Sequence, residues 1–95
     1  MYELDVKPEA DKIFKKLART NQNRLRKIDK KILEIRKQPD RTYKFLREPL
    51  QKFNRAHIDT NFVLIFKINH KEKIVDIYYF DHHDNVYKWR PKPGA

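Results

Sequence analysis

Residues 61–80, NFVLIFKINHKEKIVDIYYF, hold two apolar runs with a short polar stretch between them. The first run, 61–68, is almost continuously apolar, which is typical of a strand at the centre of a sheet. The second run, 73–80, has the length of a returning strand, and the polar residues HKEK suit the turn of a hairpin. This stretch therefore predicts two antiparallel strands at the middle of a sheet.

Two further strands are expected before this hairpin. Residues 2–6, YELDV, alternate apolar and polar side chains, which indicates a strand with one buried face. Residues 54–58 are expected to form a strand that leads into the hairpin. The segment 41–53 shows no regular period, and we expect it to be irregular, with apolar anchors at Phe45, Leu46, Leu50 and Phe53.

The region after the first strand predicts two helices. Pro8 suits the first turn of a helix, and apolar residues follow it at helical spacing until Thr20 and Asn21 interrupt the pattern. The second helix is expected over 22–37, with Asn21 or Asn23 as its cap. Its apolar residues form a narrow seam that can pack against a sheet: Leu25, Ile28, Ile32 and Ile35.

The resulting order of elements is β-α-α-β-β-β, an α+β fold with two N-terminal helices packed on a mainly antiparallel sheet. At 95 residues the chain is expected to form a single domain over residues 1–90, with a flexible C-terminal tail at 91–95. The absence of cysteine excludes disulfides and thiolate metal sites. No apolar run is long enough to span a membrane, so we expect no membrane contact and a cytoplasmic location.

The net charge gives the first indication of function. The chain has 23 basic and 13 acidic residues, and its formal net charge is +10. Such a charge on a small domain favours polyanionic partners, which are nucleic acids or acidic proteins. About half of this charge lies on the helix expected at 22–37, although a solvated charged face is the ordinary fate of such a helix.

Histidines lie at the ends of two predicted strands. His57 lies near the end of one strand, and His82 and His83 follow the last one. If the strands pair as predicted, these ends meet at one edge of the sheet, with Asn61 close to His57. Each feature also has an ordinary explanation, since a histidine in a strand is usually structural and a pair in a loop is usually solvated. The spacing from Tyr87 does not distinguish His82 from His83.

These residue types suit the cleavage of RNA without a metal ion. The reaction needs a base for the 2′-hydroxyl, an acid for the leaving oxygen and positive charge around the phosphate, and a free imidazole has a pKa of about 6.5. Asp81 and Asp84 flank the histidine pair and favour its protonated form. A metal site from His57, His83 and Asp84 has no recognised ligand spacing, so we predict no metal and no cofactor. Candidates for holding phosphate or stacking bases are Arg55, Lys52, Lys88, Tyr87 and Trp89.

The stretches RAHIDTNFVLIFKI, at 55–68, and DHHDNVY, at 81–87, resemble the RelE/ParE superfamily of toxin–antitoxin toxins. The likeness covers nearly the whole chain, to about Tyr87. It looks like the YafQ-type branch of the RelE-like mRNA interferases. That branch shows a histidine before the central strand, an acidic residue four positions later, and a histidine four positions before a terminal aromatic residue.

The resemblance implies a role for each matching residue. It places catalytic residues at His57, His83 and Tyr87, and it selects His83 over His82. The acidic position falls on Asn61, which departs from the pattern because an amide can orient a group but cannot accept a proton. Asp59 is a candidate to replace it.

The resemblance also implies a function. It implies the toxin of a type II toxin–antitoxin system, acting as a metal-independent endoribonuclease that cuts mRNA at the ribosomal A site. A cognate antitoxin, acidic and RelB-like, is expected to bind and silence it, and operator DNA is expected to be reached only through that complex. The alternatives are a non-enzymatic inhibitor of the gyrase type, which shares the fold, or a basic RNA-binding module.

Overall fold

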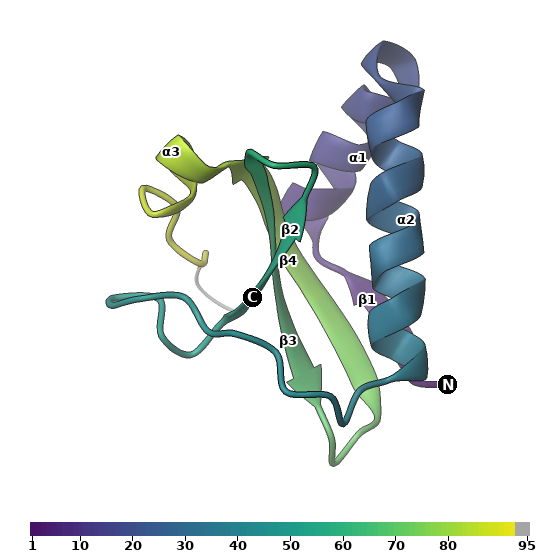
Figure 1. The fold of residues 1–95 in the computed structure, drawn as a ribbon, viewed down its shortest axis with the longest axis vertical. Helices are drawn as coiled ribbons and strands as arrows, with labels where there is room; N and C mark the ends of the chain where they lie inside the picture. The colour runs from purple at the N-terminus through teal and green to yellow at the C-terminus, as the bar shows by residue number, and fades with distance from the viewer. Residues whose placement is uncertain (93–95) are drawn as a thin grey trace.

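The structure is a computed structural model that describes residues 1–92, so residues 93–95 of the expected tail lie outside the described part. The four strands form a single sheet, and the helices and irregular segments pack on its two faces (Figure 1). In chain order they are β1 (Glu3–Val6), α1 (Pro8–Thr20), α2 (Gln22–Lys37), β2 (Asn54–Ile58), β3 (Phe62–Asn69), β4 (Ile74–His82) and α3 (His83–Val86). The predicted order is confirmed, and α3 is a short additional helix that the sequence did not indicate.

The strands are arranged in the order β1-β4-β3-β2. β3 pairs antiparallel with β2 on one side and with β4 on the other, so the predicted hairpin forms the centre of the sheet. β1 runs parallel to β4, with Leu4 opposite Val75. The α+β class with a mainly antiparallel sheet is therefore confirmed.

Both long helices cover the same face of the sheet (Figure 1). They pack on Leu64 and Phe66 of β3, which are fully buried. The Asn21 side chain caps α2 by accepting a hydrogen bond from the backbone N–H of Arg24 at 3.0 Å, which satisfies a donor that the helix leaves free. Leu25 is only half-buried, and the buried residues of α2 are Ile28, Ile32 and Ile35. Within residues 1–92, none of the helices combines the length and the apolar character needed to cross a membrane.

The opposite face of the sheet is covered by irregular chain. The segment between α2 and β2 and the segment after β4 both lie on this side, away from the two long helices (Figure 1). Trp89 is buried there and donates a hydrogen bond from Nε1 to Glu9 Oε1 at 2.9 Å. This second layer consists of Leu46, Leu50, Phe53, Val63, Ile65, Tyr78, Val86 and Trp89. Of the expected apolar anchors, Leu46, Leu50 and Phe53 belong to this layer, whereas the expectation for Phe45 is wrong, because its side chain is 59% exposed. The sequence did not indicate which face the anchors cover.

A bulge in β4 determines which way its last residues point. The register between β3 and β4 shifts midway along the strands and leaves Tyr78 without a partner. One extra residue moves every following side chain to the opposite face of the sheet. His82 consequently pairs with Phe62 on the helix-covered face, and the chain turns into α3 at His83.

Candidate functional site

A hollow of about 210 Å³ lies on the sheet face that α1 and α2 leave uncovered. Its floor is apolar and belongs to the buried second layer: Leu46, Val63 and Val86. Its polar lining consists of two guanidinium groups, two imidazoles and one phenol, from Arg47, Arg55, His57, His83 and Tyr87. Since none of these lining residues is acidic, the hollow suits an anionic ligand near groups that transfer protons.

Arg55 and His57 reach the hollow from β2. They are two positions apart on one strand, so their side chains point to the same face of the sheet. The backbone N–H of Arg55 donates to the Lys44 carbonyl oxygen at 2.9 Å. Its Nε also donates to the Phe45 carbonyl oxygen at 3.4 Å, which ties the irregular segment to β2 beside the hollow.

His83 reaches the hollow from the start of α3. Its backbone N–H donates to the Asn61 carbonyl oxygen at 2.8 Å, which fixes the end of β4 to the turn between β2 and β3. Its Nδ1 lies 3.0 Å from Asp84 Oδ1. His82 does not line the hollow, because its ring packs edge-on against Phe62 on the other face and its Nδ1 accepts from the Asp84 backbone N–H at 3.2 Å.

Tyr87 is held by Arg47 from the irregular segment. The Tyr87 hydroxyl accepts a hydrogen bond from the Arg47 backbone N–H at 3.0 Å, and the Arg47 guanidinium lies 4.8 Å from the centre of the Tyr87 ring. Burial acts to raise the pKa of Tyr87, but the hydrogen bonds from Arg47 and the positive charges of Arg47 and Arg55 together outweigh it. The pKa of Tyr87 is therefore held below its ordinary value of 10.0.

Removing the charge of Arg47 is expected to raise the pKa of Tyr87. Arg47→Met keeps the apolar stem of the side chain and the backbone hydrogen bond, so the rise reports the loss of the guanidinium group, with its charge and its side-chain hydrogen bond. The measurement is a titration of tyrosinate absorbance, taken as the difference between each protein and its Tyr87→Phe partner. Arg26→Met, which removes the same charge from the exposed side of α2, is the control and should leave the pKa unchanged. An unchanged pKa in Arg47→Met would contradict this account of the site.

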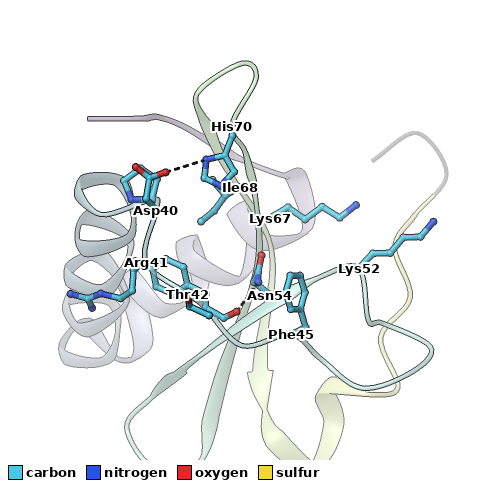
Figure 2. Close-up of a pocket in the computed structure, with 11 residues that line it drawn as sticks. Asp40, Arg41, Thr42, Phe45, Lys52, Asn54, Lys67, Ile68 and His70 are labelled. Carbon is cyan, nitrogen blue, oxygen red and sulfur yellow. Dashed lines mark hydrogen bonds and ion pairs between the residues drawn. The ribbon is translucent and has the colours of Figure 1, made fainter.

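Several other residues singled out in the sequence lie outside the hollow. Trp89, a candidate for stacking bases, is buried in the second layer. Asn61 contributes its backbone carbonyl to His83, and its side chain is not among those that line the hollow. Lys52 lines a separate, larger hollow of about 520 Å³, together with Phe45 and Asn54 (Figure 2). Lys88 lines a third hollow, beside Tyr79 and Trp89.

Asp59, the candidate acidic substitute for Asn61, is engaged with α2. It has a positive φ of 56° in the turn after β2, and its carboxylate pairs with Lys27 at 2.5 Å and with Arg24 at 3.5 Å. The hydrogen bond from Lys27 is the main cause that lowers the pKa of Asp59. This carboxylate therefore anchors the turn to the helix and does not line the hollow.

Arg47 lines the hollow but was not among the residues singled out in the sequence. It lies 40 positions before Tyr87, in a segment without a regular period. No local pattern connects the two residues, and only the packing of the neighbouring Leu46 and Leu50 on the sheet brings Arg47 to the hollow.

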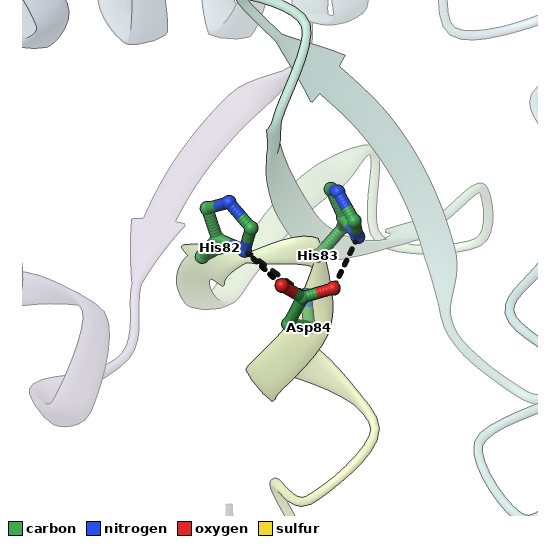
Figure 3. Close-up of side chains that lie close together, drawn as sticks. All are labelled: His82, His83 and Asp84. Atoms are coloured by element: carbon green, nitrogen blue, oxygen red, sulfur yellow. Dashed lines mark hydrogen bonds and ion pairs between the residues drawn. The ribbon is translucent and has the colours of Figure 1, made fainter.

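One group of side chains near the hollow has the donor atoms of a metal site. His82, His83 and Asp84 each offer a ligand atom, and these atoms lie within 4.8 Å of one another (Figure 3). Of the three, only His83 also lines the hollow.

Comparison with known proteins gives this architecture a family. A mainly antiparallel sheet with two helices packed on one face is the architecture of the RelE-like toxin folds. No protein-family model matches the sequence. A protein of Methanocaldococcus jannaschii described as "Putative toxin RelE4" is 47% identical over 88 residues, which cover 93% of this chain and 93% of that protein. The chain therefore belongs to the RelE family of toxins, the toxin components of type II toxin–antitoxin systems.

Solved structures share the fold at low sequence identity. A mutant of the Escherichia coli toxin RelE in the free state has a TM-score of 0.72 at 19% identity, over 92% of this chain and 90% of that chain. A chain of the toxin–antitoxin complex RelBE2 from Mycobacterium tuberculosis has a TM-score of 0.70 at 22% identity, over 86% of this chain and 98% of that chain. These similarities agree with the α+β architecture.

Proposed function

We propose that this RelE-family toxin is a metal-independent endoribonuclease that cuts mRNA at the ribosomal A site. The observation that carries the proposal is the convergence of His57, His83 and Tyr87 with two arginines in one hollow. Imidazole and phenol groups transfer protons near neutral pH, and guanidinium groups bind phosphate. The hollow thus supplies the three requirements of RNA cleavage by the substrate's own 2′-hydroxyl.

The reaction is a displacement at phosphorus. The 2′-oxygen forms a bond to the phosphorus atom as its proton passes to a base, and the bond from phosphorus to the 5′-oxygen breaks as that oxygen receives a proton from an acid. The products are a 2′,3′-cyclic phosphate and a 5′-hydroxyl. An Asp84 oxygen 3.0 Å from His83 Nδ1 orients the His83 ring, and His83 is the acid in this proposal. His57, or the Tyr87 phenol with its lowered pKa, is then the base.

The phosphate is bound mainly by Arg47 and Arg55. Both guanidinium groups line the hollow, and charge on the phosphate oxygens grows as the phosphorus becomes five-coordinate. Lys52 and Lys88 lie outside the hollow and add attraction for the RNA chain on either side of it. Asn61 acts as a positioning residue through its backbone carbonyl, which holds His83.

An acidic antitoxin of the RelB type is the partner that the charge suits. A formal charge of +10 favours a complementary acidic chain as well as the phosphate-rich ribosome. In this proposal the antitoxin silences the toxin, and operator DNA is bound only by the complex of the two.

A cleavage assay tests the proposed activity. Purified protein is mixed with end-labelled mRNA, either free or on ribosomes with a defined A-site codon, in the presence of a chelator. We expect scission within the A-site codon that the chelator does not prevent, with the two end groups named above. Intact binding without scission would contradict the proposal and would favour a non-enzymatic inhibitor or an RNA-binding module.

Substitution of Arg55 is expected to slow RNA cleavage, whereas substitution of Lys52 is expected to weaken RNA binding. Arg55→Gln is expected to lower the cleavage rate at saturating RNA by about 100-fold. A loss of this size is typical when one hydrogen-bond donor to the negative charge of the transition state is removed. Lys52→Gln and Lys88→Gln should instead weaken RNA binding at low salt and leave the saturated rate unchanged. Rates at several RNA and salt concentrations separate the two effects. If the cleavage rate at saturating RNA falls as much in Lys52→Gln as in Arg55→Gln, the phosphate that is cleaved does not bind in the hollow.

A further inference from the structure

The side chains of His82, His83 and Asp84 surround a common point at the start of α3 (Figure 3). One oxygen of the Asp84 carboxylate lies 3.4 Å from His82 Nδ1, and the other lies 3.0 Å from His83 Nδ1. The centres of the two imidazole rings are 4.5 Å apart. Two nitrogen atoms and one carboxylate thus face one another across a small gap.

Contacts with the rest of the fold hold this arrangement. The edge-on contact with Phe62 holds the His82 ring. Without an ion, His82 Nδ1 accepts a hydrogen bond from the Asp84 backbone N–H, and an ion bound at this nitrogen replaces that donor. The backbone of His83 is fixed by its hydrogen bond to Asn61. The positions of the donor atoms are therefore largely set by β3, β4 and the turn between β2 and β3.

The three side chains are also accessible. The exposed fractions of the side chains are 33% for His82, 49% for His83 and 71% for Asp84. An ion can reach them from solvent without any opening of the fold.

We propose that His82, His83 and Asp84 form a binding site for one divalent ion of the late first transition series, such as Zn²⁺. Imidazole nitrogen and carboxylate oxygen are ligands that suit such ions. Donor atoms about 2.0–2.2 Å from a tetrahedral zinc ion lie about 3.3–3.5 Å from one another. The observed separations of 3.4 Å and 3.0 Å run to the two different oxygens of Asp84, and the ligand atoms of the three residues lie within 4.8 Å of one another. Side-chain rotations that draw both nitrogens toward one of these oxygens complete the site and leave a fourth position for water.

Occupation of this site switches the toxin off. This consequence rests on the proposed function, in which His83 is the acid. A metal ion binds the neutral imidazole, so a His83 ring that holds the ion at Nδ1 cannot exist as the imidazolium that protonates the leaving oxygen. The ion is therefore an inhibitor of a metal-independent reaction, and its removal restores activity.

His82 allows the metal site to be separated from the reaction. It supplies a ligand but does not line the hollow. His82→Asn removes the imidazole and keeps a side-chain oxygen that can accept the Asp84 N–H at the cap of α3. His70→Ala is the matched control, because it removes an exposed histidine in the distal hairpin.

The test measures Zn²⁺ binding and RNA cleavage in parallel. Zn²⁺ binding is followed by competition with a chelating indicator and by the imidazole resonances of His82 and His83, and cleavage is measured with and without added Zn²⁺. We expect the wild-type protein to bind one ion at this site and to lose cleavage until a chelator is added. His82→Asn should cleave normally without metal, bind Zn²⁺ at least about tenfold more weakly and escape inhibition, whereas His70→Ala should behave as wild type.

Three results would overturn the proposal. They are unchanged Zn²⁺ affinity in His82→Asn, imidazole resonances that do not move on binding, and normal cleavage by the Zn²⁺-loaded wild-type protein. A protein that binds one ion through these residues but cuts no RNA under any condition would refute the proposed nuclease activity and would still confirm the metal site.

Discussion

Replacing His83 with alanine is expected to reduce RNA cleavage by about 100- to 10,000-fold, the range in which a single group that transfers protons contributes to a rate. His83 lines the hollow beside Arg55 and Tyr87, and its Nδ1 lies 3.0 Å from an Asp84 oxygen that orients the ring. The fold should not change, because the side chain is exposed and its structural hydrogen bond to Asn61 is made by the backbone. The rate is measured under single-turnover conditions, and thermal melting is compared with that of the wild type.

The neighbouring histidine provides the control. His82→Asn alters an adjacent imidazole, which packs on the opposite face of the sheet, and it should cleave at the wild-type rate in the absence of added metal. If His83→Ala cleaves RNA as fast as the wild type, His83 is not the acid. If His82→Asn loses as much activity as His83→Ala, both histidines take part in the reaction, and the bulge in β4 does not keep His82 away from the hollow.

Placing a carboxylate in the centre of α2 is expected to unfold the protein. Ile28 is 0% exposed and packs between the helix and the sheet. Ile28→Asp removes about 2–3 kcal/mol of apolar burial and adds several kcal/mol for an unpaired charge away from water. A domain of this size has a free energy of unfolding of only about 5–15 kcal/mol. We therefore expect no cooperative thermal transition in this variant, and the same outcome for Ile32→Asp.

Leu33 supplies the matched control for this substitution. It lies on the same helix but is 41% exposed, so Leu33→Asp places the same carboxylate in water and should change the melting temperature only slightly. Circular dichroism during heating distinguishes the two variants. A wild-type melting curve for Ile28→Asp would mean that this face of α2 does not pack on the sheet.

Most of the fold could be predicted from local patterns. The second helix was expected over 22–37, and α2 has those bounds because its apolar spacing, the Asn21 cap and Pro39 are all read within a few residues. The expected hairpin strands at 61–68 and 73–80 lie within one or two residues of β3 and β4. The last strand was expected to stop at Phe80, but pairing with β3 carries it to His82.

The candidate site was predicted less completely. His57, His83 and Tyr87 were placed by resemblance to a family, and the structure brings the three together in one hollow with Arg55. Lys52 and Lys88 were grouped with them only by nearness in sequence, and they line other hollows.

The sequence by itself determined the order of helices and strands, the basic charge and the kinds of groups available for chemistry, because these depend on periodicity, caps and composition over short stretches. Only the tertiary structure decided which groups meet. The bulge at Tyr78 sends His82 to one face and leaves His83 to begin α3 beside the other. The irregular segment carries Arg47 to Tyr87 from 40 positions away. Both outcomes depend on how distant apolar residues fill the second face of the sheet, and no local pattern in the sequence encodes such long-range packing.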